Sequence, residues 1–190
     1  LGPVTQFKSQ RQARAHFGLP EQAKLFCFSF DLNSYIERKN PQACVEAFLL
    51  AFGQDEYSDA VVGLVIKVHT PNQPNKAWDN LKALAERDQR IHIIEQTLDR
   101  SDLLALYQTC DCFISLHRAE GFGRTLAEAM LLGKPVIATN YSGNQFFMHP
   151  EHTLPVEYDL VPVQTGDYHF VETSDAAMWA NPRISHLAKR

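Results

Sequence analysis

The stretch CFISLHRAEGFGRTLAEAMLLGKPVIAT, residues 112–139, decides the fold of this 190-residue chain. It opens with an apolar run at 112–116, passes two glycines in a short loop, and continues over 123–132 with the spacing of an amphipathic helix. The tripeptide that begins at Gly133 (Gly-Lys-Pro) then ends the helix before a second apolar run at 136–139. Strand, helix and strand in succession are typical of a parallel sheet, because parallel strands need a crossover connection.

The same alternation extends upstream of this stretch. Apolar runs of strand length lie at 24–30, 60–69 and 90–95. Helical patterns follow them, and we expect their N-caps at Asn40, at Asn75 and at Asp99 or Ser101. The pattern therefore predicts an α/β fold with a doubly wound parallel sheet that extends to about residue 147. Beyond it, four prolines predict irregular chain and a short closing helix at 185–190.

Composition and charge limit the kinds of protein that this chain can be. Apolar residues make up 45% and charged residues 21%, which excludes a disordered or fibrous protein. Eighteen basic and 22 acidic side chains give a net charge of −4, so no nucleic-acid partner is expected. The apolar runs are too short to span a membrane. Because no charged-then-apolar leader follows Leu1, we expect a piece of a longer protein.

The cysteines and histidines do not form an obvious metal or disulfide framework. The four cysteines, at 27, 44, 110 and 112, lack C-x-x-C spacing, which favours reduced, packed thiols in a cytosolic protein. His149 and His152 form the tightest histidine pair, but Pro150 between them argues against a helix that presents both rings to one metal ion. We therefore predict no metal site.

Ligands of open parallel sheets bind beyond the carboxyl ends of the strands. The loops expected at that edge are 31–40, 70–75, 96–101, 117–123 and 140–144.

The loop at 117–123 carries the most chemistry. Gly121 and Gly123 let the backbone approach a ligand, and the helix that follows offers free N–H groups to an anion such as a diphosphate. Glu120 and Glu128 can accept hydrogen bonds from hydroxyls, so a ligand with phosphate and sugar parts fits. The alternative is a tight turn with two solvated glutamates. A dinucleotide fingerprint after the first strand and a phosphate-binding loop with the Walker spacing are both absent from the sequence.

The segment from Glu120 to Glu128 (EGFGRTLAE), followed by GKPVIA from Gly133, resembles the E-x7-E segment of the retaining glycosyltransferases of family 4. Further stretches are similar to that family: Phe28-Ser-Phe-Asp31 up to Arg38-Lys-Asn-Pro41, Thr139-Asn-Tyr-Ser-Gly-Asn144 and Trp179-Ala-Asn-Pro182. The resemblance implies a GT-B enzyme, in which two Rossmann-like domains face each other across a cleft. It identifies the chain as the C-terminal, nucleotide-sugar-binding domain.

The resemblance also implies roles for single residues. Glu128 would hold the nucleotide ribose, Glu120 the hydroxyls of the transferred sugar, and Lys39 would neutralise the diphosphate. The catalytic residues implied are Lys39, Glu120 and Arg38. The donor-binding residues implied are Glu128, Gly121, Phe122, Gly123, Arg124, Thr125, Ser34, Lys67, Thr97 and Leu98. No metal and no cofactor is implied besides the nucleotide diphosphate sugar, which is the substrate, because a fixed cation and backbone dipoles would stabilise the leaving phosphate.

Departures from the family pattern leave open which residue provides the second positive charge for the diphosphate, in addition to Lys39. The family has an arginine several residues before the lysine, where this chain has Asn33 and Ser34. Either Arg38 or Lys67 replaces that arginine, or Ser34 donates to a phosphate oxygen. Lys67 stands where the family commonly has glycines. The alternative to a role as the second cation is that Lys67 is simply a solvated residue at a strand end.

Two further groups border the predicted cleft. His117 and Arg118 either align the donor or acceptor or belong to a charged loop that faces solvent. Ser142, Gly143 and Asn144 are expected to line the sugar pocket.

The predicted function is the donor half of a retaining, metal-independent glycosyltransferase. Residues 1–20 would be a linker or first helix from the missing N-terminal domain, and residues 21–190 the Rossmann-like donor domain. That N-terminal domain would bring an unknown glycan or lipid-linked acceptor, and the isolated fragment would be inactive. The expected location is cytoplasmic, peripheral at the inner membrane face through the missing half. The alternative is a non-catalytic Rossmann-like domain kept for binding or assembly.

Overall fold

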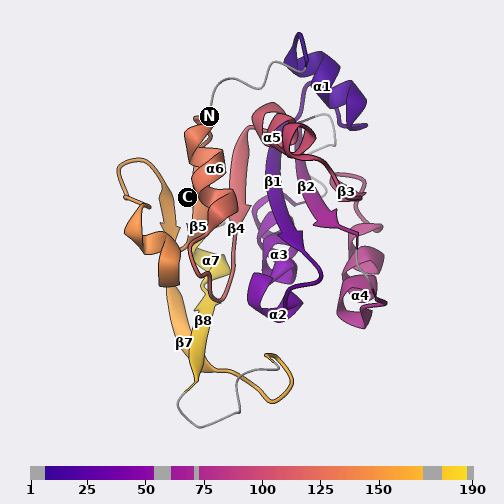
Figure 1. Ribbon diagram of the computed structural model, residues 1–190. Coiled ribbons are helices and arrows are strands. Elements are labelled where there is room, and N and C mark those ends of the chain that lie inside the picture. The colour runs from indigo at the N-terminus through magenta and orange to yellow at the C-terminus, as the bar shows by residue number, and fades with distance from the viewer. Residues whose placement is uncertain (1–6, 54–60, 71–72, 169–176, 188–190) are drawn as a thin grey trace.

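The computed structural model describes residues 7–53, 61–70, 73–168 and 177–187. Its main element is a six-stranded parallel sheet with the strand order β3-β2-β1-β4-β5-β6 (Figure 1). The strands are β1 (Lys24–Asp31), β2 (Val62–His69), β3 (Ile91–Glu95), β4 (Cys112–Ser115), β5 (Val136–Thr139) and β6 (Leu154–Val156). Because the strand order reverses between β1 and β4, the predicted Rossmann-like, doubly wound α/β fold is confirmed.

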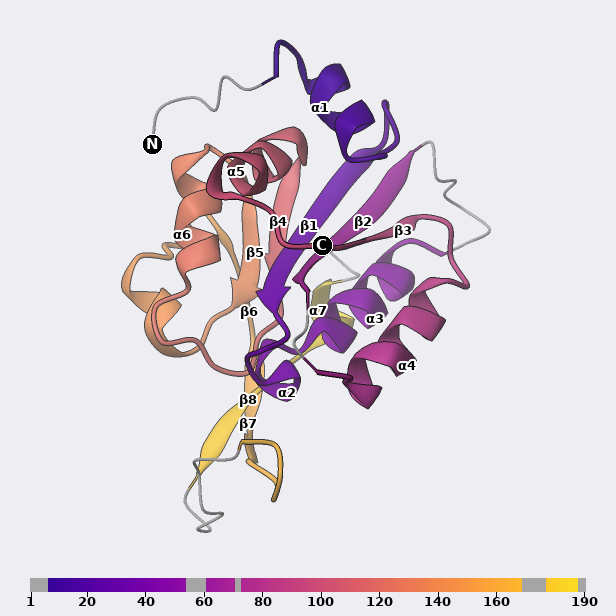
Figure 2. The ribbon, with the colours of Figure 1, turned by 45° about the vertical axis from the view of Figure 1, so that its right-hand side comes forward.

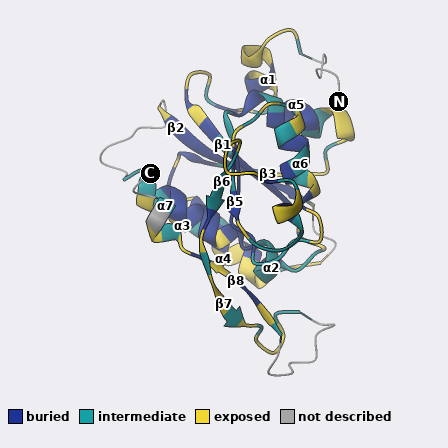
Figure 3. Cartoon of the chain, turned by 90° about the vertical axis from the view of Figure 1, so that its left-hand side faces the viewer, coloured by how far each residue is buried: buried dark blue, intermediate teal, exposed yellow. Residues whose placement is uncertain are grey.

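Helices cover both faces of this sheet. On one face lie α3 (Pro41–Ala51), α4 (Lys76–Ala85) and α7 (Ile184–Leu187). On the other lie α1 (Gln10–His16), α5 (Arg100–Thr109) and α6 (Arg124–Leu131). The short helix α2 (Ile36–Lys39) follows β1, and the 3-10 helix η1 (Ser142–Phe146) follows β5. Buried residues concentrate in the strands and in the helix faces that cover them (Figure 3). Within the described residues, no helix has the length and apolar character that crossing a bilayer requires.

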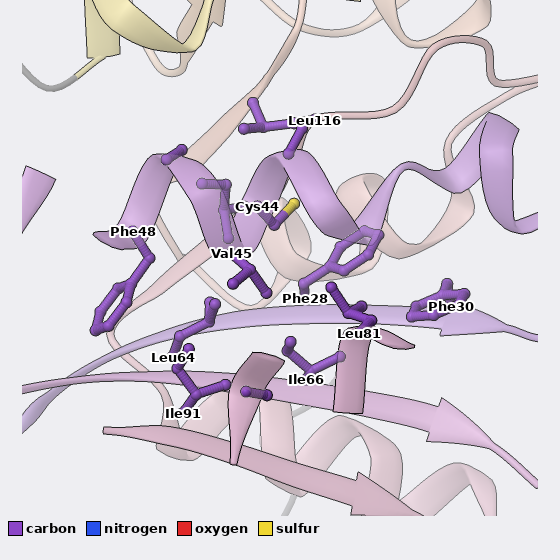
Figure 4. Packing of buried hydrophobic residues seen from close by; sticks show 14 of the residues in the cluster. Phe28, Phe30, Cys44, Val45, Phe48, Leu64, Ile66, Leu81, Ile91 and Leu116 are labelled. Carbon is purple, nitrogen blue, oxygen red and sulfur yellow. The ribbon is translucent and has the colours of Figure 1, made fainter. Parts of the chain in front are cut away.

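Alternate residues of each strand enter two separate cores. On the α3 side, Phe28 of β1 and Ile66 of β2 pack beneath Cys44 (Figure 4). On the α5 side, Cys27 and Val65 belong to the second core. Because both faces are covered, the strands consist of nearly continuous apolar residues, and this is the property that locates them in the sequence.

Two of the predicted helix caps are confirmed. The Asn75 side chain accepts a hydrogen bond from the Trp78 amide at 3.0 Å. At the start of α5, Asp99 rather than Ser101 is the cap, and it accepts a hydrogen bond from the Asp102 amide at 2.8 Å.

Asn40 is the N-cap residue of α3, as predicted, but its side chain makes no capping hydrogen bond. Asn40 has a φ of 52° and joins α2 directly to α3, so it turns the chain between two helices. Its side-chain amide donates instead to the Leu116 carbonyl at 2.9 Å. The first loop is thereby tied to the residue that follows β4.

The chain after residue 147 is more regular than its prolines predict. It adds the edge strand β6 to the sheet and then forms an antiparallel hairpin from β7 (Tyr158–Pro162) and β8 (Met178–Pro182). Figure 2 shows this hairpin projecting from the carboxyl edge of the sheet. Proline is compatible with these positions because edge strands and strand ends do not need every backbone N–H.

All four cysteines are free thiols, and Cys27, Cys44 and Cys110 are buried. Burial raises the pKa of Cys44 to about 12, although a backbone hydrogen bond with Leu116 acts in the opposite direction. The prediction of packed thiols rather than disulfides is therefore confirmed.

A buried ion pair anchors α1 to the start of β1. Arg14 is 3% exposed, and its guanidinium donates to Asp111 Oδ2 and to the Ala23 carbonyl, each at 2.8 Å. Asp111 also accepts the Leu25 amide at 2.9 Å. Partial burial by itself raises the pKa of Asp111, but the Leu25 amide and the charges of Arg14 and Lys24 outweigh it and lower the pKa.

Replacing Asp111 with Asn is expected to lower the free energy of unfolding at neutral pH by about 1–3 kcal/mol, because Arg14 loses its anion. Since the folded-state pKa of Asp111 is lowered, this contribution is present above about pH 4 and disappears as the pH falls through the folded pKa. Urea denaturation of both proteins from neutral to acidic pH measures the difference. Asp159→Asn, in an exposed ion pair with Arg183, is the control and should change stability by less than about 1 kcal/mol. Equal stability of D111N and wild type at neutral pH would contradict this role.

Candidate functional site

The carboxyl ends of β1 and β2 and the starts of α5 and α6 enclose a cleft of about 840 Å³. The cleft lies beside the reversal of strand order, the place where open α/β sheets bind ligands. Figure 2 shows this region, with β1 pointing toward α2 and with α6 to the left of β1.

Most of the predicted donor-site residues meet in this cleft. Those that line it are Ser34, Arg38, Lys39, Lys67, Glu120, Gly121, Phe122, Gly123, Arg124, Thr125 and Glu128. They come from the segment after β1, from β2, from the loop after β4 and from α6. Residues distant in the chain are thus brought to one edge of the sheet by the parallel topology.

Polar side chains replace apolar ones where the strands reach the cleft. On the α5 side of the sheet, β1 carries the buried Cys27 and then Ser29, while β2 carries Val65 and then Lys67. Ser29 and Lys67 are partners in the parallel register, and both line the cleft. The same sheet face is therefore core at one end and cleft floor at the other.

The glycine loop directs the start of α6 toward the cleft. Gly123 is the N-cap of α6 and has a φ of 84°, a left-handed conformation that favours glycine. Gly123 and the first helical residues, Arg124 and Thr125, line the cleft. The positive end of the helix dipole therefore faces any ligand bound there, and this arrangement favours an anion.

The loop after β5 contacts the glycine loop on the side away from the cleft. Gly143 donates its amide to the Glu120 carbonyl at 2.9 Å, and the Ser142 hydroxyl donates to the same carbonyl. The Glu120 amide in turn donates to Ser142 Oγ at 3.0 Å. A Cβ at Gly143 would lie only 1.9 Å from the Gly121 carbonyl oxygen. Ser142 and Gly143 were expected to line the sugar pocket, whereas the structure places them behind the loop, where they position Glu120.

His117 is also a supporting residue and does not border the cleft. It is fully buried, and its ring nitrogens lie 3.0 Å from Asn144 Oδ1 and 3.1 Å from Ser115 Oγ. The Asn144 amide nitrogen donates to the Thr139 carbonyl at 2.9 Å, so its oxygen faces His117 and accepts the Nε2 proton. Burial lowers the pKa of His117 and so favours the neutral ring, although the charge of Glu120 acts in the opposite direction. Asn144, expected in the sugar pocket, is buried in this network.

Arg118 lies outside the cleft as well. Its guanidinium stands over the Trp179 ring at 5.0 Å, and its side chain lines a separate cavity of about 180 Å³. Its amide donates to the Arg38 carbonyl at 2.8 Å, and its own carbonyl accepts the Ala180 amide at 3.0 Å. Arg118 thus joins α2 to the hairpin, which neither of its two predicted roles anticipated.

Two of the predicted donor-binding residues, Thr97 and Leu98, do not line this cleft. Thr97 is exposed, and Leu98 packs against the α5-side core. The residue of this segment that reaches the cleft is Arg100, the first residue of α5.

Each of the two cleft glutamates is paired with a cation. Lys39 Nζ donates to Glu120 Oε1, and Arg38 Nη1 lies 3.6 Å from Glu120 Oε2. Arg100 Nη1 lies 2.6 Å from Glu128 Oε1. The side chains of Glu120 and Glu128 are only 12% and 7% exposed, so these pairs offset the cost of burying the two carboxylates.

Sequence reasoning missed Arg100 and Tyr107, which both line the cleft. A signal for Arg100 was present, because a cation in the first turn of a helix opposes the helix dipole and needs a compensating anion. Tyr107 occupies a position of the apolar stripe of α5 and gives no such signal. Burial raises the pKa of its phenol, so the hydroxyl stays neutral.

A family model described as "Glycosyl transferases group 1" matches residues 9–153 of the chain. Among curated proteins, the D-inositol 3-phosphate glycosyltransferase of Corynebacterium glutamicum (strain R) is 27% identical over 139 residues. This alignment covers 72% of the chain and 32% of that protein. The chain therefore spans about a third of the length of the curated relative that it matches.

Solved structures of the same architecture are similar to the chain. The C-terminal domain of a glycosyl transferase group 1 family protein (LpcC) from Francisella tularensis superposes with a TM-score of 0.62 at 20% identity, over 80% of this chain and 75% of that chain. Anabaena Alr3699/HepE in complex with UDP and glucose superposes with a TM-score of 0.60 at 19% identity, over 74% of this chain and 35% of that chain. At these identities the similarity establishes the fold.

Replacing Gly143 with Ala is expected to displace the glycine loop, because the new methyl group would overlap the Gly121 carbonyl. Such overpacking costs about 1–3 kcal/mol of stability. Gly121→Ala is the matched control, since a Cβ there meets nothing within 4 Å. Urea denaturation measures the stability change, and amide chemical shifts of residues 120–123 report the displacement. Unchanged shifts and stability in G143A would show that the close contact does not position the loop.

Proposed function

The chain belongs to the glycosyl transferases of group 1, and from that membership we propose that its cleft binds a nucleotide diphosphate sugar as the donor of a glycosyl transfer. Membership in a glycosyltransferase family and the Rossmann-like fold agree with the sequence-based prediction. The assignment to family 4, retention of configuration and independence from metal are parts of the proposal.

One observation carries the proposal: a lysine, two glutamates with little exposure and the start of a helix converge on a single cleft. Lys39 and the amides of the Phe122–Gly123 segment offer positive charge and donors to a diphosphate. Glu120 and Glu128 offer acceptors to sugar hydroxyls. Polar groups of both kinds in one cleft match the two chemical halves of a nucleotide sugar. The description of the Anabaena relative as a complex with UDP and glucose supports a ligand of this class.

The proposed roles follow from where charge develops during transfer. When the bond between the sugar C1 and the distal phosphate oxygen breaks, its electron pair goes to the phosphate and the sugar becomes oxocarbenium-like. Lys39 and the backbone dipoles of the glycine loop would stabilise that phosphate in place, which lowers the barrier. Glu120 would hold the hydroxyls of the sugar, and Glu128 the hydroxyls of the ribose. Since Lys39 contacts Glu120 in the present structure, it would exchange that partner for the phosphate.

The rest of the reaction lies outside this chain. We propose that the acceptor, a glycan or a lipid-linked glycan, binds to an N-terminal Rossmann-like domain, and that residues 21–190 are the donor domain. A cytoplasmic enzyme that meets the inner membrane face through the other half fits this arrangement. No nucleic-acid partner is proposed.

A second candidate is a non-catalytic domain of the same family. The observation that favours it is the pair Asn33 and Ser34 at the place of the family arginine. Enzymatic transfer and its loss in cleft variants separate the two candidates.

A binding panel on the purified chain tests the donor site. UDP, GDP, ADP and dTDP and their sugars are titrated by calorimetry with and without Mg²⁺. One nucleotide is expected to bind without metal. Glu128→Ala should lower the affinity for this nucleotide by about tenfold or more, because charged hydrogen bonds to the ribose are lost. Glu86→Ala, at an exposed position outside the cleft, is the control and should bind as the wild type does. Binding of no nucleotide by folded full-length protein would overturn the proposal.

A transfer assay tests the catalytic role. The full-length enzyme is expected to lose transfer by about 100-fold or more on Lys39→Ala, because a group that stabilises the leaving phosphate in the transition state is removed. The 190-residue chain alone should bind donor and transfer nothing. Unaltered rates for both Lys39→Ala and Glu128→Ala would favour the non-catalytic candidate.

A further inference from the structure

Lys67 is a buried cation in the floor of the cleft. It lies on β2, two residues before the end of the strand, and is only 5% exposed. Its neighbours along the strand, Ile66 and Val68, are fully buried in the opposite core. The ammonium group therefore enters the cleft from the sheet itself rather than from a flexible loop.

Among the described residues, no carboxylate lies within 4.0 Å of the Lys67 ammonium. Asp31 acts on it only at longer range. Burial lowers the pKa of Lys67, and Asp31 acts in the opposite direction. A buried charge without a close counterion is costly, so such a position is understandable where a ligand supplies the anion.

Lys39 and Arg38, the two half-buried cations of the cleft, are committed to protein partners. Lys39 pairs with Glu120. Arg38 donates from Nη2 to Ser34 Oγ at 2.8 Å and from Nη1 to the Ala119 carbonyl at 2.9 Å. These hydrogen bonds connect the Arg38 guanidinium to the segment after β1 and to the loop after β4, so Arg38 holds the two segments together.

Exposure distinguishes Lys67 from the remaining two cations. Arg100 is paired with Glu128 and its side chain is 55% exposed. Arg124 is exposed to solvent at the start of α6, where water can hydrate it. Lys67 alone combines deep burial, a place in the cleft and the lack of a close anion in the described part of the chain.

We propose that Lys67 is the second cation of the site and binds the diphosphate of the ligand from the sheet side, while Arg38 is a positioning residue of the first loop. This inference rests on the proposed donor function and names the residue that was left open between Arg38 and Lys67. A diphosphate suits Lys39 and Lys67 together, because its charge is spread over two linked phosphates. The Glu120 carboxylate, in contrast, pairs with Lys39 and not with Lys67. Ser29, the register partner of Lys67, adds a hydroxyl donor at the same depth.

The test compares ligands with and without the diphosphate on the full-length protein. Lys67→Met keeps the length and apolar stem of the side chain and removes the charge. It is expected to lower the affinity for the nucleoside diphosphate selected by the binding panel by about 10- to 100-fold, because a charge-assisted hydrogen bond is lost. The matching nucleoside should bind as it does to the wild type. Lys67→Arg should restore most of the affinity, and inorganic pyrophosphate should follow the diphosphate.

Controls separate charge, folding and site effects. Lys76→Met removes an exposed lysine outside the cleft and should leave all affinities unchanged. Without ligand, K67M should melt at or above the wild-type temperature, because it no longer buries a charge; Lys67→Gln is the second variant if K67M does not fold. Diphosphate binding by K67M equal to the wild type would overturn the inference and leave the donor function intact. Equal losses for nucleoside and diphosphate would also overturn it, since they indicate a structural role.

The outcomes for the two proposals are distinguishable. If wild type binds pyrophosphate in a Lys67-dependent way but binds no nucleotide, the donor function fails and the anion role of Lys67 stands. If wild type binds neither, both fail.

Discussion

The glycine loop of the cleft depends on backbone contacts that larger side chains would prevent. Gly143 approaches the Gly121 carbonyl more closely than any Cβ allows, and Ser142 adopts a φ of 77° beside it. Through this contact the Glu120 peptide is fixed by two hydrogen bonds from the loop after β5. The buried His117 and its partners lie beneath the same loop and have no direct path to a ligand. The orientation of the cleft residues is therefore set by neutral, buried groups behind them.

The two glutamates of the cleft are each balanced by a nearby cation. Among the described residues, Lys67 is the buried cation of the cleft that has no close anion. A diphosphate would compensate Lys67 and compete with Glu120 for Lys39. Hydroxyls of the sugar and ribose would then meet carboxylates already held in place. Ligand binding would thus exchange the partners of lysines and glutamates that are already in place. The protein would need little reorganisation to bind the negative charge of the diphosphate.

The sequence predicts the local features of this fold better than its long-range contacts. The strands follow from continuous apolar runs, and the caps at Asn75 and Asp99 follow from short-range hydrogen-bonding chemistry. Arg100 escaped prediction because its partner Glu128 is 28 residues away and the pair depends on how α5 meets α6. His117 was placed at the cleft because it follows β4 in the loop that carries Glu120, whereas contacts with Ser115 and with Asn144, 27 residues away, bury its ring. The hairpin of β7 and β8 was missed because prolines, which predict breaks in regular structure, also occur in edge strands and at strand ends.

A crystal structure of the full-length protein with a bound nucleoside diphosphate tests the central claim most directly, namely that this cleft is the donor site. The distal phosphate is expected within hydrogen-bond distance of Lys39 Nζ and of the Gly123 amide, and the ribose hydroxyls are expected to contact Glu128. In that complex, the Lys39–Glu120 and Arg100–Glu128 pairs should be opened or shared with the ligand. A nucleotide bound elsewhere, with both pairs intact as they stand here, would contradict it.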